Sequence, residues 1–142
     1  SLRNALFFDQ LKATARQLIG PVAEAGQESV LNQSGYLLKI DLERNCVWME
    51  AETREEAKAD TLKQRRISVP DSVRIMDVVS LYGGKRSQGT TGIRFTKKGY
   101  VDKTFIHLQD DDGRSMTIML SPFLGVTRVV DTYVELGEQQ AF

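Results

Sequence analysis

The feature that most constrains this fold is the separation of one helical segment from a long series of strand-like segments. The N-terminal segment carries apolar side chains at helical spacing, at Phe7, Leu11, Ala15 and Leu18. After Gly35 the sequence becomes a succession of short apolar runs separated by turn residues. Such runs favour antiparallel pairing, because parallel strands need long crossover connections. We therefore predict an α+β domain, with an N-terminal helix packed on antiparallel β-sheets that form two small sheets.

The chain of 142 residues is long enough for a single domain with its own core. We divide it into a helical segment over residues 1–33, a β-rich body over 36–134 and a tail over 137–142. The dipeptide Gly20-Pro21 predicts a kink or a short break in the helix, because proline lacks the backbone N–H that a helix uses.

The predicted strands are the apolar runs over residues 36–42, 46–50, 66–69, 73–79, 93–95, 104–108, 115–120 and 126–134. The charged stretch 53–64 has no apolar stripe and is predicted to be a solvated connection. Glycine-rich residues 83–89 are predicted to form a flexible loop, and residues 97–99 a turn between two strands.

Charge gives little reason to expect a polyanionic partner. Lysine plus arginine and aspartate plus glutamate both number 19, so the formal net charge is zero. A balanced chain has no general attraction for nucleic acid or anionic lipid. We expect no nucleic-acid partner, and any polyanion patch would have to come from the basic doublets Lys85-Arg86 and Lys97-Lys98.

Two residues are candidates for side-chain chemistry because each is the single member of its type. His107 is the one histidine, and it alternates with apolar neighbours, so we expect a partly exposed strand residue without a catalytic role. Cys46 is the one cysteine and cannot form an intramolecular disulfide; we expect a small buried apolar residue. The sequence predicts no catalytic residue and no cofactor.

Three contiguous aspartates, Asp110 to Asp112, precede Gly113 and could suggest a calcium loop. Calcium loops place their acids at alternate positions so that the chain can wrap the ion. Asp-Gly between two strands is instead typical of a tight turn. We therefore predict a turn here and no metal site.

Five segments in the second half follow one another in a characteristic order. They are RISVPDSVRI (66–75), IRFTKKG (93–99), TFIHL (104–108), DGRSMTI (112–118) and SPFLGVTRV (121–129). Their order and spacing resemble the H-type minor pseudopilins of type II secretion (general secretion pathway protein H) and their type IV pilin-like relatives. The pattern departs from that family at Lys97, Ser72 and Leu124, where proline, glycine and threonine are usual.

The resemblance implies a non-enzymatic filament subunit that acts in protein export through protein–protein contacts. Its partners would be other pseudopilins or pilin-like subunits, and the inner membrane through an N-terminal helix absent from this sequence. The chain would then be the periplasmic domain of an inner-membrane-anchored bacterial protein. The sequence begins at Ser1 without an initiator methionine and at once shows a helical pattern, which fits a missing upstream segment. Leu2, Leu6 and Phe8 lie off the helix stripe and are the predicted assembly interface.

One alternative from a different class is a stand-alone β-rich module that binds DNA or a small ligand. It would use the basic loop residues Lys85, Arg86, Lys97 and Lys98. Salt-dependent binding to DNA would distinguish the two hypotheses, because phosphate contacts release counterions. An enzyme is a third hypothesis, for which the sequence shows no set of residues around His107.

Overall fold

The computed structural model describes residues 2–53, 66–122 and 127–137, and side chains in the first range from Gln10 onward. The predicted solvated connection over residues 53–64 and the predicted tail over 137–142 fall almost entirely outside these ranges. The division of the chain into segments therefore stays a prediction.

The first element is the helix α1, Leu2–Leu31. It buries one continuous stripe made of Leu11, Ala15, Leu18, Val22 and Ala25. The stripe continues beyond Pro21, so the short break predicted at Gly20-Pro21 is wrong. A fully buried valine contributes about 1.5–3 kcal/mol, which is comparable with the cost of about 3 kcal/mol for an interior proline. Packing of the second half of α1 thus offsets the missing backbone hydrogen bond.

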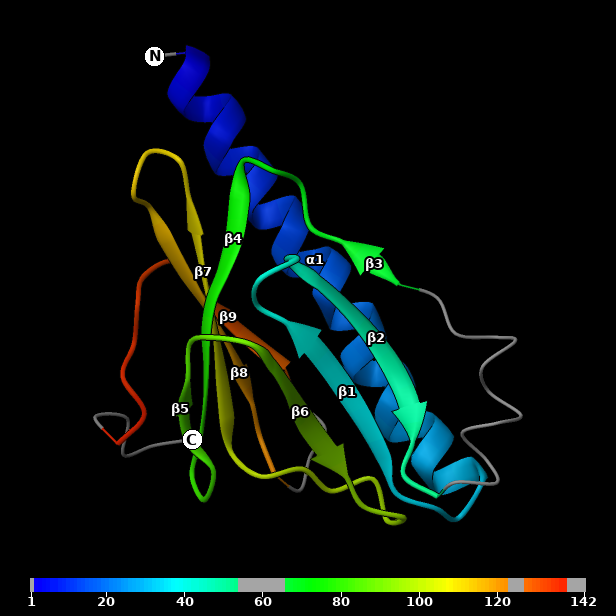
Figure 1. Cartoon of the computed structure of the whole chain (residues 1–142). Helices are drawn as coiled ribbons and strands as arrows, with labels where there is room; N and C mark the ends of the chain where they lie inside the picture. The colour runs from blue at the N-terminus through cyan, green and yellow to red at the C-terminus, as the bar shows by residue number, and fades with distance from the viewer. Residues whose placement is uncertain (1, 54–65, 123–126, 138–142) are drawn as a thin grey trace.

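The strands form two antiparallel sheets (Figure 1). The first sheet has the order β3-β2-β1-β6, with β1 Tyr36–Asp41, β2 Cys46–Ala51, β3 Ile67–Ser68 and β6 Thr90–Phe95. The second sheet has the order β5-β4-β7-β8-β9, with β4 Val73–Ser80, β5 Gly84–Arg86, β7 Thr104–Asp110, β8 Ser115–Leu120 and β9 Thr127–Val130. The predicted α+β fold with a helix on two small antiparallel sheets is confirmed.

One local prediction is confirmed and two differ from the structure. The predicted turn at residues 97–99 lies between two strands, but these strands belong to different sheets, because β6 pairs with β1 whereas β7 pairs with β4. The turn therefore connects the two sheets. The expected loop over residues 83–89 contains the short strand β5, which pairs with the end of β4. The last strand, β9, is shorter than the predicted run over 126–134.

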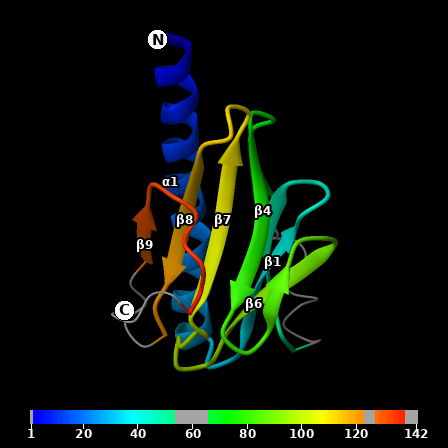
Figure 2. The ribbon, with the colours of Figure 1, turned by 90° about the vertical axis from the view of Figure 1, so that its left-hand side faces the viewer.

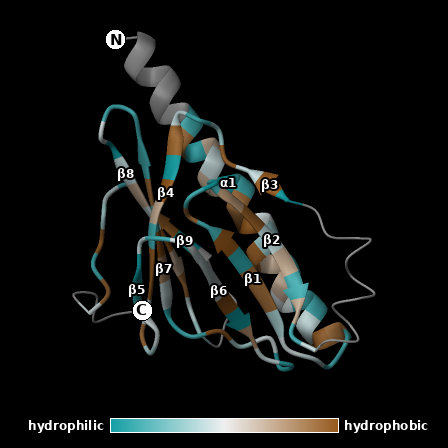
Figure 3. Ribbon diagram, in the orientation of Figure 1, coloured by the Kyte–Doolittle hydropathy of each residue, from teal (hydrophilic) through white to brown (hydrophobic). Residues whose placement is uncertain are grey.

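The core lies between α1 and one face of each sheet. Alternate residues of β1 are buried, namely Tyr36, Leu38 and Ile40, and Figure 3 shows both hydrophobic and hydrophilic residues along this strand. In β7 and β8, Ile106 and Ile118 meet the same core. Figure 2 shows that residues 131–137 lie over the opposite face of the second sheet from α1. We call these residues the C-terminal strap.

Asn45 connects the two sheets at the turn between β1 and β2. Its side-chain amide donates to the Val73 carbonyl at 2.7 Å, and its oxygen accepts from the Ile75 N–H at 2.9 Å. Asn45 is only 8% exposed and has a φ of 59°. Asparagine tolerates this left-handed conformation better than most residues. One side chain thus both closes a hairpin in the first sheet and holds β4 of the second.

Candidate functional site

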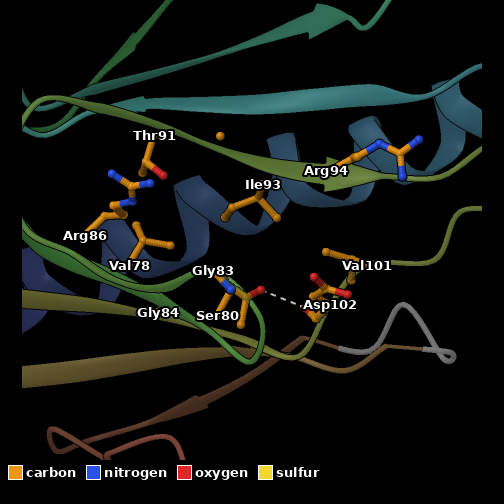
Figure 4. A pocket seen from close by; sticks show the side chains of 12 residues that line it. Val78, Ser80, Gly83, Gly84, Arg86, Thr91, Ile93, Arg94, Val101 and Asp102 are labelled. Carbon is orange, nitrogen blue, oxygen red and sulfur yellow. Dashed lines mark hydrogen bonds between the residues drawn. The ribbon is translucent and has the colours of Figure 1, made fainter.

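A cleft of about 240 Å³ opens between the two sheets, where the end of β4 and the strand β5 face β6 (Figure 4). Its apolar part comes from Val78 of β4, Ile93 of β6 and Val101, each no more than 6% exposed. Pockets for small molecules usually measure about 300–1,000 Å³. The cleft is therefore better suited to a few side chains of a partner than to a cofactor.

One wall of the cleft is the edge of β6. Four consecutive residues of this strand, 91–94, line the cleft. Successive side chains of a strand point to opposite faces, so four in a row can share one cavity only along the strand edge. β6 is the terminal strand of the first sheet and pairs only with β1 on its other side. Its open edge therefore faces the cleft.

The two arginines of the cleft differ in their surroundings. Arg94 donates through Nε to Glu52 Oε1 at 2.7 Å, and this hydrogen bond and the charge of Glu52 raise the pKa of Arg94. The Arg86 side chain is exposed and makes no hydrogen bond or ion pair within the part of the chain that the structure describes. Figure 4 shows the two guanidinium groups toward opposite ends of the cleft. The guanidinium group at one end of the cleft therefore has no ion pair among the described residues.

The basic residues that the sequence singled out lie on separate elements. Lys85 and Arg86 belong to β5, and only Arg86 lines the cleft. Lys97 and Lys98 lie in the turn after β6, where the neighbouring Gly99 packs close to Val30 near the end of α1. Lys85 instead lies 4.0 Å from Asp77 Oδ2.

Leu2, Leu6 and Phe8 lie in the first turns of α1, but their side chains are outside the described part of the structure. Figures 1 and 2 show these turns extending past the ends of the neighbouring strands. The assembly role of the three residues stays a prediction.

His107 is fully buried, so the prediction of a partly exposed strand residue is wrong. Its Nδ1 lies 2.5 Å from Asp77 Oδ1 and its Nε2 lies 2.6 Å from the Val134 carbonyl. The reason is tertiary: β4 supplies Asp77 on one side, and the C-terminal strap covers the ring on the other. Neither partner could be inferred from the sequence, because both are distant from His107 along the chain.

Tyr133 completes the cluster around His107. Its ring stacks on the imidazole with centroids 3.6 Å apart, and its hydroxyl donates to Asp77 Oδ2 at 3.0 Å. Burial, and then the hydrogen bond with Asp77, raise the pKa of Tyr133. The interaction with Tyr133, followed by the charge of Asp77, raises the pKa of Lys85.

This cluster attaches the strap to the sheet and leaves no ring nitrogen of His107 open. Each ring nitrogen lies within hydrogen-bond distance of an oxygen, Asp77 Oδ1 for Nδ1 and the Val134 carbonyl for Nε2. The Thr117 hydroxyl adds contacts to the strap: it donates to the Thr132 carbonyl at 2.6 Å and accepts from the Val134 N–H at 2.9 Å. A general base or metal ligand needs a free lone pair, which this arrangement does not offer.

Two further predictions of the sequence are confirmed. Cys46 is buried, at 6% exposure. Asp110 begins the predicted turn: its Oδ1 accepts from the N–H groups of Asp112 and Arg114. Gly113 supplies the positive φ of 83° that this turn requires. Within the described ranges no three His, Cys, Asp or Glu side chains gather as a metal site would need.

Two solved structures are similar to this chain, and both are the minor pseudopilin EpsH from the type II secretion system of Vibrio cholerae. The first has a TM-score of 0.66 and 10% identity, and the match covers 89% of this chain and 97% of that chain. The second has a TM-score of 0.59 and 10% identity, with 86% and 97% covered. This chain has the fold of a minor pseudopilin. The resemblance inferred from the five sequence segments is thus confirmed at the level of fold.

No protein-family model matches the sequence, and no curated protein matches it either. Among the helical residues that the structure describes, no stretch is long and apolar enough to cross a membrane.

Proposed function

We propose that this chain is a structural subunit of a type II secretion pseudopilus or a related type IV pilus-like filament. It acts in protein export by contacting other pilin-like subunits, and it performs no catalysis. The observation that carries the proposal is the match of the whole fold to EpsH, over 97% of that chain. In the same proposal the chain is the periplasmic part of a bacterial protein anchored in the inner membrane by a helix upstream of Ser1.

The described residues support an assembly role. The one histidine is engaged at both ring nitrogens, and the inter-sheet cleft is small for a cofactor. The first turns of α1 extend past the sheets (Figure 1), where a neighbouring subunit could contact them. We assign the helix contact to Leu2, Leu6 and Phe8, since apolar side chains on a protruding helix typically mark an interface.

The test is complementation of secretion in the source bacterium. A strain that lacks the gene is expected to lose secretion and to regain it with the full-length gene. Leu6→Glu in that gene is expected to abolish secretion while the protein accumulates normally, because a charge would be buried between helices. Gln17→Glu, at an exposed position of the same helix, is the matched control and should leave secretion intact.

Two outcomes would contradict the proposal. Normal secretion by the deletion strain would remove the filament role. Tight binding of the purified domain to duplex DNA, weakening steeply with salt, would favour the alternative binding module with Lys85, Arg86, Lys97 and Lys98. The formal net charge of zero argues against that result.

A further inference from the structure

We propose that the open edge of β6 binds an extended segment of a partner subunit as an added β-strand, with a carboxylate of that segment facing Arg86. This inference rests on the proposed function and names the kind of contact that one surface of the domain makes. Strand addition uses main-chain hydrogen bonds for affinity and side-chain pockets for specificity. The cleft beside β6 offers both.

The register of the first sheet shows which backbone groups of β6 are free. The Leu42 N–H donates to the Gly89 carbonyl at 2.9 Å, just before β6 begins. Hydrogen-bonded pairs alternate along an antiparallel ladder, and the register pairs Ile40 with Thr91. Odd-numbered residues of β6 therefore bond to β1. The backbone groups of Thr90 and Gly92 point away from β1, toward the open edge.

The open stretch is bounded, and it is the least protected edge of the two sheets. An isolated bridge between Phe95 and Val101 closes the edge beyond Arg94. The other terminal strands, β3, β5 and β9, are shorter than the six residues of β6. Exposed edges are usually protected by proline, charged side chains or short length; β6 has no proline, and its one charged residue, Arg94, lies near the end of the strand and is paired with Glu52. An unprotected edge in a subunit that assembles is a natural place for a partner strand.

The charged side chains of the cleft indicate which kind of segment would bind there. At one end Arg94 is paired with Glu52, and Asp102 adds a further negative charge nearby. At the other end Arg86 has no ion pair among the described residues. A segment with an acidic side chain at this end would form one. The apolar part of the cleft, with Val78 and Ile93, accepts an alternate apolar side chain of the same segment.

Gly92 allows a precise test, because its N–H belongs to the free edge. Gly92→Pro removes this donor and places a ring on the open side, while the ladder to β1 keeps its bonds. Gly92→Ala keeps the donor; its Cβ would lie 3.4 Å from Lys39 Cδ, an ordinary contact. For charge, Arg86→Glu is paired with Arg128→Glu, which changes an exposed arginine of β9 at the far edge of the second sheet.

The probes are the purified soluble domains of other pilin-like proteins of the source bacterium, measured by calorimetry against the wild type and each variant. We expect Gly92→Pro and Arg86→Glu to weaken the binding of one of these domains by about tenfold or more, as the loss of one or two hydrogen bonds or a charge pair implies. Gly92→Ala and Arg128→Glu should bind like the wild type.

Hydrogen exchange on the wild type keeps the test independent of how the proline variant folds. The Gly92 amide should exchange rapidly in the free domain and slowly in the complex. If a domain binds but this amide is not protected, and Arg86→Glu binds normally, the strand-addition proposal is wrong while the filament role stands. If none of the pilin-like domains binds, both proposals lose their support.

Discussion

Asn45 is the residue on which the relative position of the two sheets depends most directly. Its replacement by alanine is expected to leave the Val73 carbonyl and the Ile75 N–H buried without partners. Each unsatisfied group costs about 1–3 kcal/mol, and alanine at positive φ adds about 1–2 kcal/mol. We expect Asn45→Ala to lower the free energy of unfolding by about 3 kcal/mol or more, measured by urea denaturation.

The control for Asn45 is glycine, which adopts the same φ without strain but also lacks the two hydrogen bonds. Asn45→Gly should therefore be less damaging than Asn45→Ala by about 1 kcal/mol. Equal stability of Asn45→Gly and the wild type would show that the side-chain bonds contribute nothing.

Tyr133 provides a pH-dependent signal from the strap. Burial and the hydrogen bond with Asp77 raise its pKa above that of an ordinary tyrosine. The pKa of Tyr133 is higher in the folded than in the unfolded protein. The contribution of protonated Tyr133 to the free energy of unfolding is therefore complete below about pH 10, the ordinary tyrosine pKa, and is lost as the pH rises through the folded pKa. In an alkaline absorbance titration, Tyr133 should therefore ionise at a higher pH than an ordinary tyrosine.

Substitution assigns this late step. Tyr133→Phe should reduce the amplitude of this late ionisation by one tyrosine. An unchanged late amplitude in Tyr133→Phe would mean that the strap does not dock as described.

At the scale of elements, α1 keeps two weak helix formers in its interior, Gly20 and Pro21. A Cβ at Gly20 would meet nothing within 4 Å, so Gly20→Ala should stabilise the domain by about 0.5–1 kcal/mol. Pro21→Ala restores a backbone donor inside the helix and should stabilise it by about 1 kcal/mol or more. Thermal unfolding followed by circular dichroism measures both.

The outcome for Pro21 also tests why the helix is unbroken. If packing of Val22 and Ala25 offsets the cost of the proline, then the single variant Val22→Ala, which keeps Pro21, should lose helicity in the part of α1 after Pro21. Adding Pro21→Ala to that variant should recover the lost helicity. A Pro21→Ala variant less stable than the wild type would mean that the proline is part of the packed arrangement.

At the scale of the whole molecule, the second sheet is covered on both faces, by α1 and by the strap (Figure 2). The Asp77–His107 pair is buried in the contact with the strap. Removing one member leaves a buried charged or polar group without its partner, so Asp77→Leu or His107→Leu should each cost about 3–5 kcal/mol. The double variant should cost much less than the sum of the two.

A double-mutant cycle by chemical denaturation gives this coupling. Additive losses in the cycle would mean that the two side chains do not interact as the structure shows. Arg128→Glu, on the exposed side of β9, serves as a control that should be nearly neutral.

The inter-sheet cleft shows how far the sequence could identify a site. Arg86 stood out as part of a basic doublet, but its place beside an open strand edge could not be inferred from the sequence. That edge exists because β6 pairs with β1 and does not form a hairpin with β7, the next strand along the chain. Lys97 and Lys98, which the sequence grouped with Arg86, lie in the turn after β6 and do not line the cleft.

The sequence by itself determined the elements whose causes are local. The 3.6-residue spacing of Leu11, Ala15 and Leu18 set the helix, and Asp-Gly at Asp112 and Gly113 set the hairpin turn between β7 and β8. Both depend on neighbours within a few residues, so single-sequence reasoning sees them. The order of segments over residues 66–130 was likewise enough to identify the fold.

Only the tertiary structure decided which strands pair and which polar groups are buried together. A strand of suitable pattern can join any open edge, and the pairing of β6 with β1 depends on how α1 and both sheets pack at once. His107 illustrates the same point, since its partners come from β4 and from the C-terminal strap. Even the continuity of α1 through Pro21 was decided by burial on the sheets. The physical reason is common to all three: contacts between segments distant in sequence contribute more free energy than the local preferences they override.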